Sequence, residues 1–334
     1  MKRILKAREL TSFLFLVALF LIVGIINPSF LKPGNIIACF NDSVVYIIIS
    51  VAMAFAIFIG EIDVSVGANL GFTATVVATM LRDGKNWALA FVIGLCIGAL
   101  IGLFNGWGVA VMGVPSLIFT LGTNGVMRGM MYVYTGGDWV ENLPQKFKQL
   151  YTASVFGGVS NMFLVTVAGV IIIHLLLRRT RPGRYFIAVG DNPQGANLVG
   201  IPAVRTRVAA YIICGILASA AGIVFTSRIG FITAISGSGY EMKAVAACVL
   251  GGISLSGGVG TVIGASIGAV IMASISRLLV FMEIGSTYDN TITGIMLIVI
   301  VVSDSLMQHK AAEQNRRARL AARTMTAEGG AGNE

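Results

Sequence analysis

The chain has 334 residues, of which 56% are hydrophobic and 12% charged, with a formal net charge of +9 at pH 7. Soluble domains carry about 25% charged residues, so this composition excludes a soluble monomer. Apolar runs recur from Leu10 to Met307, and a helix needs about 20 apolar residues to cross a hydrocarbon core of about 30 Å. The composition therefore predicts an all-α, polytopic transmembrane helical bundle.

The N-terminus resembles a signal peptide, because four basic residues precede an apolar run over residues 10–26. That run is longer than the usual apolar region of a signal peptide, about 7 to 15 residues, and no small-x-small cleavage site follows it. We therefore expect residues 1–9 to be a cytoplasmic N-terminus and the apolar run to be the retained first span.

Hydropathy and Gly/Pro punctuation divide the rest of the chain into further apolar segments, which makes ten in all. They lie near residues 10–27, 43–59, 64–81, 87–111, 114–134, 159–177, 207–226, 241–256, 259–281 and 290–307. We expect a transmembrane domain over residues 10–307 with a cytoplasmic loop at 178–206. Residues 308–334 are predicted to be a disordered tail, since few apolar residues follow Leu320.

The distribution of basic residues predicts the orientation, because short cytoplasmic loops collect Lys and Arg. Residues 1–10, 178–207 and 308–334 carry net charges of +3, +5 and +2. The loops on the other face hold six basic and six acidic residues. Both termini are therefore predicted to be cytoplasmic. The basic tail could indicate nucleic acid, but topology and anionic lipid headgroups explain the positive charge, so no nucleic-acid partner is expected.

Glycine spacing indicates an internal repeat of five plus five spans. The fourth segment carries Gly94, Gly98, Gly102 and Gly106, and the ninth carries Gly260, Gly264 and Gly268, both at intervals of four. Such glycines line one helix face and let another helix approach closely in lipid. Halves of five spans would be inverted in the membrane, as in many transporters. Chance similarity between glycine-rich helices is the alternative.

Signatures of catalysis, cofactors and metals are absent from the sequence. No GxxxxGK[ST] or HExxH motif occurs, the four cysteines are scattered singly, and the two histidines (His174 and His309) have no evident partner. We therefore expect no ATP hydrolysis on this chain, no cofactor, no metal and no enzymatic activity.

Charged residues within or beside the apolar segments are the candidates for function, because a charge at the bilayer centre costs about 2.5–3.5 kcal/mol. Asp63 lies in GEIDVSVG (60–67), Arg128 within the fifth segment, and Glu241 at the start of the eighth. Asp63 can line a pathway or cap the following helix. Arg128 lies too far from either end of its segment to snorkel easily, so it should face protein or a polar cavity.

The loop over residues 178–206 predicts a short helix outside the membrane. Asp191 or Asn192 can be its N-cap, Pro193 suits the first helical position, and Gly200 suits a left-handed stop. Isolated helices of about two turns are marginal in water, so this one should need a partner surface.

Four stretches together resemble the ribose, arabinose, rhamnose and autoinducer 2 type of sugar permeases of ATP-binding-cassette (ABC) importers. They are residues 60–67, 115–130, 179–202 and 239–270, and with hydropathy the resemblance covers about residues 10–307. Residues 135–144 and 230–258 look most like the permeases that import autoinducer 2. The family often has GGIDLSVG, whereas here Glu61 replaces the second glycine, which puts a close backbone contact there in doubt.

The resemblance implies a bacterial inner-membrane permease that works by alternating access. Its partners would be cytoplasmic ATPase subunits, a periplasmic sugar-binding protein, a second permease copy or paralogue, and membrane lipid. A coupling helix would dock on the ATPase through residues Asp191, Asn192, Pro193, Gln194, Gly195, Ala196 and Gly200. Neutral sugars suit a pathway of weakly polar groups, for which the candidates are Asp63, Ser65, Asn69, Thr120, Thr123, Asn124, Arg128, Glu241 and Ser256.

Two other functions fit parts of the sequence. An ion-coupled secondary transporter would need paired charges near the midplane and no docking helix, and Glu61 with Asp63 keep it open. A membrane scaffold or sensor would tolerate changes in the loop helix. The sequence leaves open which sugar is carried and whether the partner permease is identical.

Overall fold

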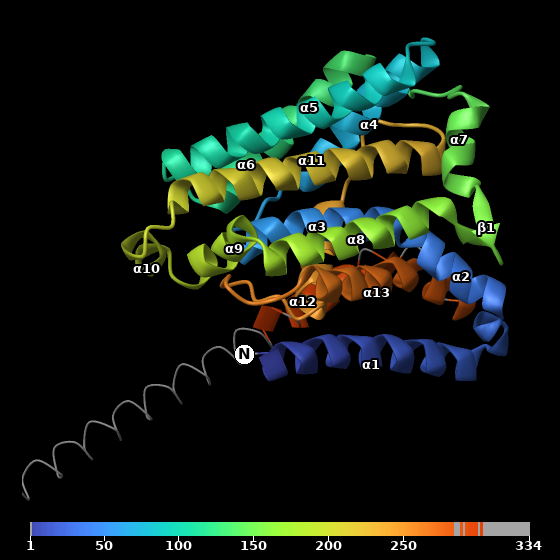
Figure 1. Cartoon of the computed structure of the whole chain (residues 1–334). Helices are drawn as coiled ribbons and strands as arrows, with labels where there is room; N and C mark the ends of the chain where they lie inside the picture. The colour runs from blue at the N-terminus through green and yellow to red at the C-terminus, as the bar shows by residue number, and fades with distance from the viewer. Residues whose placement is uncertain (1, 284–287, 290, 300, 303–334) are drawn as a thin grey trace, which may run out of the picture.

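The computed structural model describes residues 2–283, 288–289, 291–299 and 301–302 (Figure 1). The longer helices are α1 (Lys2–Ile26), α3 (Val44–Phe58), α4 (Val66–Arg82), α5 (Trp87–Gly106), α6 (Ser116–Thr135), α8 (Asn161–Arg179), α11 (Ala203–Ile229) and α13 (Val262–Phe281). Shorter ones are η1 (Pro28–Leu31), α2 (Pro33–Asp42), η2 (Trp107–Val111), α7 (Gln145–Thr152), α9 (Arg181–Asp191), α10 (Pro193–Leu198) and α12 (Tyr240–Leu250). The predicted tail 308–334 lies outside the described residues.

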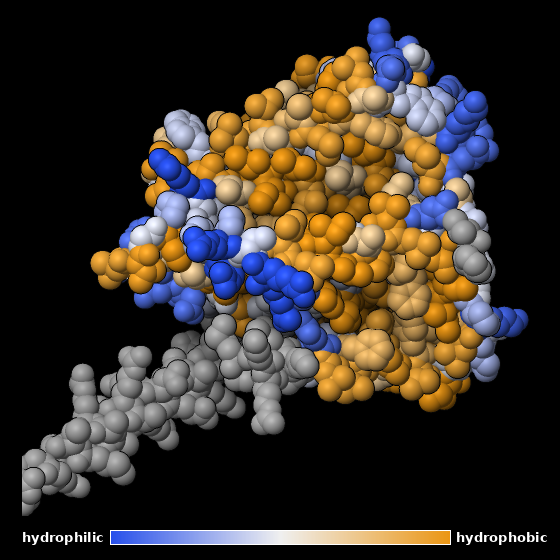
Figure 2. Space-filling model, in the orientation of Figure 1, coloured by the Kyte–Doolittle hydropathy of each residue, from blue (hydrophilic) through white to orange (hydrophobic). Residues whose placement is uncertain are grey.

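The long helices run side by side, with α9, α10 and the start of α1 at one end of the bundle and α2, α7 and β1 at the other (Figure 1). An apolar band covers the visible flank between them, and hydrophilic side chains gather at both ends (Figure 2). A protein surrounded by hydrocarbon needs such a belt, because its apolar side chains face lipid tails. The described residues thus form a helical protein of the membrane type.

Five helices are long and apolar enough to cross a membrane: Glu9–Ile26 of α1, Trp87–Val111, α8, α11 and α13. The α2–α3 pair, bent by 41°, counts as a sixth if it is one span. The remaining predicted spans form helices that are shorter or more polar. For example, α12 has 11 residues, and the 20-residue α6 carries Thr120, Asn124 and Arg128. The structure therefore supports five or six spans by this measure, and the tenth predicted segment lies partly outside the described residues.

The glycine faces predicted from the sequence are sites of close helix packing. A Cβ atom at Gly98 or Gly102 of α5 would overlap the backbone of α11. A Cβ atom at Gly264 or Gly268 of α13 would likewise overlap the backbone at the end of α12. Both stripes thus bring two backbones together, as the spacing predicted.

The two halves of the chain make corresponding contacts. Helix α5 of the first half packs on α11 of the second half, and α13 of the second half packs on α3 of the first half. In the same way, α4 packs on α11 and α12 packs on α3. If the predicted spans are numbered from one to ten, α5 with α11 is the pair 4 and 7, and α13 with α3 is the pair 9 and 2. Shifting each span number by five therefore converts one pair into the other.

The end opposite α10 is tied by polar contacts. The Asp42 carboxylate at the end of α2 binds Arg228 of α11 at 2.9 Å and Arg277 of α13 at 2.5 Å. A two-stranded antiparallel hairpin, β1 (Ser154–Phe156) with β2 (Val159–Ser160), precedes α8. This hairpin is a small addition to the predicted all-α fold.

Candidate functional site

The helical path breaks between α3 and α4, at the GEIDVSVG segment. Gly60 has φ of +78°, which favours glycine because it has no Cβ. The Asp63 Oδ1 atom then accepts hydrogen bonds from the Ser65 backbone N–H (2.9 Å) and from the Ser65 hydroxyl (2.6 Å). Because α4 starts immediately afterwards at Val66, Asp63 fixes the turn that begins this helix.

Asp63 belongs to a buried polar network, here called the Asp63 cluster: Asp63, Ser65, Asn105, Thr120 and Thr123. The Asn105 Nδ2 group of α5 donates to the Ser65 hydroxyl at 2.8 Å and lies 3.4 Å from both Asp63 oxygens. Thr123 donates to Asn105 Oδ1 at 2.8 Å, and Thr120 accepts from the Val64 N–H at 3.1 Å. These residues are at most 7% exposed, so the cluster is both enclosed and hydrogen-bonded.

Asn69 extends this polar interior toward α11. Its Nδ2 group donates to the Gly215 carbonyl at 3.1 Å, and its Oδ1 atom accepts from the Ser219 hydroxyl at 2.9 Å. Thr73, one turn along α4, lies 2.8 Å from the same Ser219 hydroxyl. Asn69 thus joins two packed helices.

A second break precedes α12, and its residues meet the start of α4. A Cβ atom at Gly67 would overlap the Glu241 Oε2 atom, and one at Gly71 would overlap the Ser236 carbonyl. Gly237, with φ of +76°, lies against the Gly67 carbonyl. The two glycines one turn apart on α4 therefore make room for the loop before α12.

What we call the Arg128 cluster comprises Arg128, Asn124 one turn before it on α6, Ser236 in the loop before α12, and Glu241 in the first turn of α12. Arg128 of α6 donates to the Ser236 carbonyl at 2.6 Å, and Glu241 Oε1 accepts from the Gly239 N–H at 3.2 Å. The Glu241 Oε2 and Asn124 Oδ1 atoms are buried and have no hydrogen-bond partner among the described residues. This cluster therefore differs from the Asp63 cluster in having unused acceptors.

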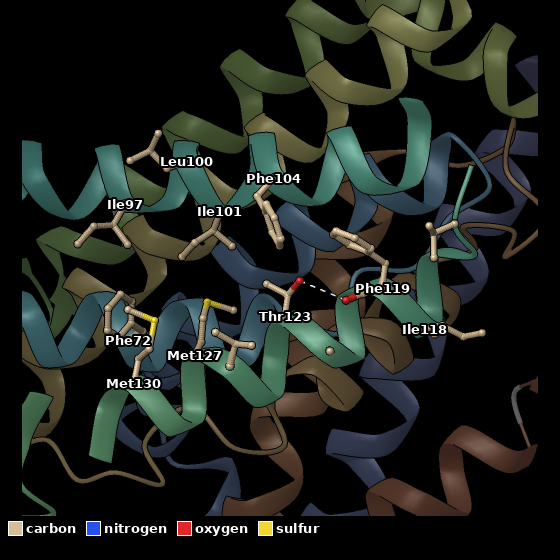
Figure 3. A pocket seen from close by; sticks show the side chains of 13 residues that line it. Phe72, Ile97, Leu100, Ile101, Phe104, Ile118, Phe119, Thr123, Met127 and Met130 are labelled. Atoms are coloured by element: carbon tan, nitrogen blue, oxygen red, sulfur yellow. Dashed lines mark hydrogen bonds between the residues drawn. The ribbon is translucent and has the colours of Figure 1, made fainter. Parts of the chain in front are cut away.

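A separate groove of about 680 Å³ lies between α5 and α6 (Figure 3). Its walls are aliphatic, aromatic and methionine side chains, including Ile101, Phe104 and Met130. The hydroxyl of Thr123, which also lines it, donates to the Phe119 carbonyl at 3.2 Å. Since this lining offers almost nothing to a hydroxyl-rich ligand, the groove is a poor site for a sugar.

At the α10 end, three segments meet backbone to backbone. The Gly258 N–H donates to the Phe58 carbonyl, the last residue of α3, at 3.0 Å. A Cβ atom at Gly190 of α9 would overlap the same carbonyl, and one at Gly257 would lie 2.7 Å from the Gly60 nitrogen. This glycine junction connects the 178–206 loop directly to the break before α4.

Glu61 does not obstruct the glycine junction. Its carboxylate forms an ion pair with Arg207 of α11, and both side chains are half-buried. The backbone that comes close to another segment is that of the neighbouring Gly60, which lies against the Ser256 carbonyl. Ser256 is an exposed residue in the loop before α13. The departure from the GGIDLSVG pattern is thus accommodated by an ion-pair partner.

The loop helix begins where the sequence predicted. Asn192, the second of the two candidates, caps α10 by accepting from the Gly195 N–H at 2.8 Å, Pro193 is its first residue, and Gly200 has φ of +82°. Ala196 packs with Val189 and Ala203 in a small apolar cluster. This cluster anchors α10 on α9 and α11, so the helix is less isolated than we expected.

The far side of α10 has no such cover. Leu198 and Val199 are 88% and 75% exposed, the largest exposed fractions among the apolar side chains of this loop. Asp191, Asn192, Pro193, Gln194 and Gly200 are exposed as well. Apolar side chains displayed in a polar loop are typical of a docking surface.

The structure thus divides the sequence-predicted residues into three places. Asp63, Ser65, Asn69, Thr120 and Thr123 are interior, Asn124, Arg128 and Glu241 belong to the Arg128 cluster, and Ser256 lies in the loop at the α10 end. Sequence reasoning missed Asn105, Gly67 and Gly190. The sequence signal for Asn105 was an amide side chain within a long apolar segment. The roles of Gly67 and Gly190 depend on the segments that pack against them, which the sequence does not show.

Comparison with known proteins decides the family. Residues 35–301 match the family model described as "Branched-chain amino acid transport system / permease component". The chain belongs to this family of ABC importer permeases. It is therefore a transport subunit rather than an enzyme, and permeases of this kind operate with ATP-hydrolysing and substrate-binding partners.

Several curated relatives cover nearly the whole chain. The "Autoinducer 2 import system permease protein LsrC" of Enterobacter sp. (strain 638) is 41% identical over 95% of this chain and 92% of its own length. The protein of the same name from Escherichia coli O9:H4 (strain HS) is 39% identical over 98% of this chain and 95% of its own length. No solved structure matches the chain.

Proposed function

We propose that this permease imports autoinducer 2, or a small sugar of the rhamnose or ribose class, across the bacterial inner membrane. The observation that carries the proposal is the similarity, over nearly the whole chain, to permeases named for autoinducer 2 import. The polar groups beside α6 fit a neutral, hydroxyl-rich solute, because they offer hydrogen bonds without net charge. A transported solute of this kind needs hydrogen bonds to the protein that are weak enough to break as it moves along the path.

The proposed topology has ten spans in two inverted halves, with both termini in the cytoplasm. The equivalent contacts of α5 with α11 and of α13 with α3 support the repeat. Glu9 of α1 accepts a hydrogen bond from Thr261 at 2.5 Å, so the N-terminal region lies at the α10 end. That end carries the arginines of the 178–207 segment, which favours a cytoplasmic location.

α10 is the proposed docking helix for an ATPase subunit. Leu198 and Val199 offer an apolar contact, and Ala196 holds the helix to the rest of the loop. Movement of α9 would reach the α3–α4 break through Gly190 and Gly258, because backbone contact leaves little room for independent motion. The periplasmic binding protein would then deliver the sugar at the opposite end, beside α7.

A second permease copy or paralogue is proposed to pack along α6. A Cβ atom at Gly125 or Gly129 would meet no described atom within 4 Å, so these glycines leave a shallow strip on the helix surface. Glycine strips of this kind let a neighbouring helix approach closely in lipid. The path would lie between the two copies and open alternately to either side.

The test is uptake into proteoliposomes that contain this permease, its ATPase and its binding protein. Labelled autoinducer 2, rhamnose and ribose are supplied outside and ATP inside, with and without a protonophore. We expect ATP-dependent uptake of one sugar that survives loss of the proton gradient. Uptake that the protonophore abolishes while ATP remains would support the ion-coupled alternative instead.

A charge on the docking helix sharpens this test. Leu198→Glu should abolish ATP-dependent uptake while the permease is still inserted, because the substituted side chain faces outward. Leu198→Met, which keeps an apolar side chain at the same exposed position, is the matched control and should transport normally. Normal uptake by the Leu198 variant would remove α10 from the mechanism.

A further inference from the structure

We propose that Asn124, Arg128 and Glu241 form a binding site for a neutral ligand with neighbouring hydroxyl groups, such as a vicinal diol of a small sugar. The inference rests on the proposed function and specifies where the transported solute is held. Two hydroxyl groups would donate to Asn124 Oδ1 and Glu241 Oε2, and Arg128 would donate to a ligand oxygen.

Two buried acceptors of the Arg128 cluster are unused. Buried acceptors without a partner are rare in folded proteins, because burial removes the hydrogen bonds that water would supply. The Glu241 Oε2 and Asn124 Oδ1 atoms are both buried without a partner in the described structure, although the other Glu241 oxygen accepts the Gly239 N–H. Hydroxyl donors of a ligand would satisfy both.

The helix register places the two acceptors at the same level of the bundle. Thr120 of α6 contacts Val64 just before α4, and the Met131 side chain lies against Gly71 further along α4. Asn124, between these two contacts, therefore lies at the level of Gly67. Since the Glu241 carboxylate lies against Gly67, both acceptors occupy the same level of the bundle.

The two charged side chains of the site have opposite signs. Glu241 interacts electrostatically with Arg128, but the two side chains form no direct ion pair. Arg128 has five N–H donors, and only its Nη1 group is hydrogen-bonded among the described contacts. A site with one positive and one negative group has no net charge. It therefore suits a neutral polyol better than a sugar phosphate or sugar acid.

The site also has access to the proposed path. Asn124 and Arg128 are half-buried, and they lie at the edge of the α6 surface that displays Leu121 and Gly125. The Asp63 cluster lies on the enclosed side of the same helix. A solute moving along α6 would thus meet the Arg128 cluster first.

The experiment compares Glu241→Gln and Asn124→Leu with wild type in the reconstituted complex. We expect each variant to lower uptake at subsaturating sugar about tenfold, which corresponds to the ~1.4 kcal/mol of one good hydrogen bond. Uptake is expressed per assembled complex, which is quantified for each variant. Asn161→Leu is the matched control, because Asn161 Oδ1 is also buried and unpartnered but lies at the start of α8.

Wild-type uptake by both variants would overturn the site and indicate that the two acceptors hold only water. If a variant lowers the amount of complex, the site is tested on the wild-type protein instead. The measurement is the melting temperature of the detergent-solubilised complex, without binding protein, in the presence of added sugar. The sugar that wild type imports should raise that temperature more than an analogue lacking one hydroxyl of the diol, which is 2-deoxyribose where ribose is imported. Equal effects of the two would contradict the site. Absence of ATP-dependent uptake by wild type would instead refute the proposed function.

Discussion

Two polar clusters lie on neighbouring faces of α6, and they differ in how completely their hydrogen bonds are made. In the Asp63 cluster, Asp63, Asn105 and Thr123 are partnered with one another across three segments of the chain. In the Arg128 cluster, Asn124 and Glu241 each keep a buried oxygen without a partner. The incomplete hydrogen bonds, and not polarity alone, therefore distinguish the Arg128 cluster from the Asp63 cluster.

This difference changes the interpretation of Asp63. From sequence, Asp63 was equally suited to lining a path or capping a helix. Its enclosure and its bonds to Ser65 favour the structural role. We therefore propose that the Asp63 cluster supports the start of α4, while the Arg128 cluster contacts the solute.

The largest expected effect comes from the packed glycines. Gly102→Val should prevent accumulation of folded permease, because even a Cβ atom there would overlap the Tyr211 carbonyl of α11. The measurement is the amount of monodisperse protein extracted in mild detergent. Gly125→Val is the matched control on α6. It should yield a folded chain that no longer pairs with a second permease, and equal loss for both variants would contradict the distinction.

Removal of the Asp63 carboxylate should have the next largest effect. Asp63→Ala leaves the Ser65 N–H and the Ser65 hydroxyl without their acceptor. We expect a loss of about 2–4 kcal/mol in the free energy of unfolding, since bonds to charged groups contribute about 1.5–3 kcal/mol each. Thermal unfolding of the detergent-solubilised complex measures it. An unchanged melting temperature would show that the cluster does not stabilise α4.

Thr123→Val should cost about 1 kcal/mol, because it removes one neutral hydrogen bond to Asn105 Oδ1 and keeps the shape of the side chain. The same unfolding measurement tests it. Thr135→Val is a suitable control, since that hydroxyl bonds the Met131 carbonyl within its own helix and should matter less. A larger effect in the control would reverse the ranking.

The Glu61–Arg207 ion pair should have the smallest effect. Both side chains are partly exposed, at 18% and 26%, and exposed pairs contribute at most about 1 kcal/mol. A double-mutant cycle with Glu61→Gln and Arg207→Gln measures the coupling energy, which should fall further at high salt. A coupling energy well above about 1 kcal/mol would instead indicate that the ion pair stabilises the glycine junction.

The sequence predicted the helical membrane fold, the close-packed glycine faces and the start of α10, because these depend on composition and local spacing. It did not predict that Asp63 meets Asn105, or that Gly67 faces Glu241. Those contacts join residues separated by 42 and 174 positions, so they depend on how the helices pack. The hydrogen-bonding state of each polar atom is likewise a property of the packed structure.

The most direct test of the two roles measures stability and transport on one matched pair of variants, Asp63→Asn and Glu241→Gln. Both replace a carboxylate with an amide of the same size. We expect the Asp63 variant to melt at a lower temperature but to transport normally per folded complex. The Glu241 variant should keep its melting temperature and lose about tenfold in uptake. Loss of transport by a fully stable Asp63 variant, together with normal transport by the Glu241 variant, would contradict these two roles.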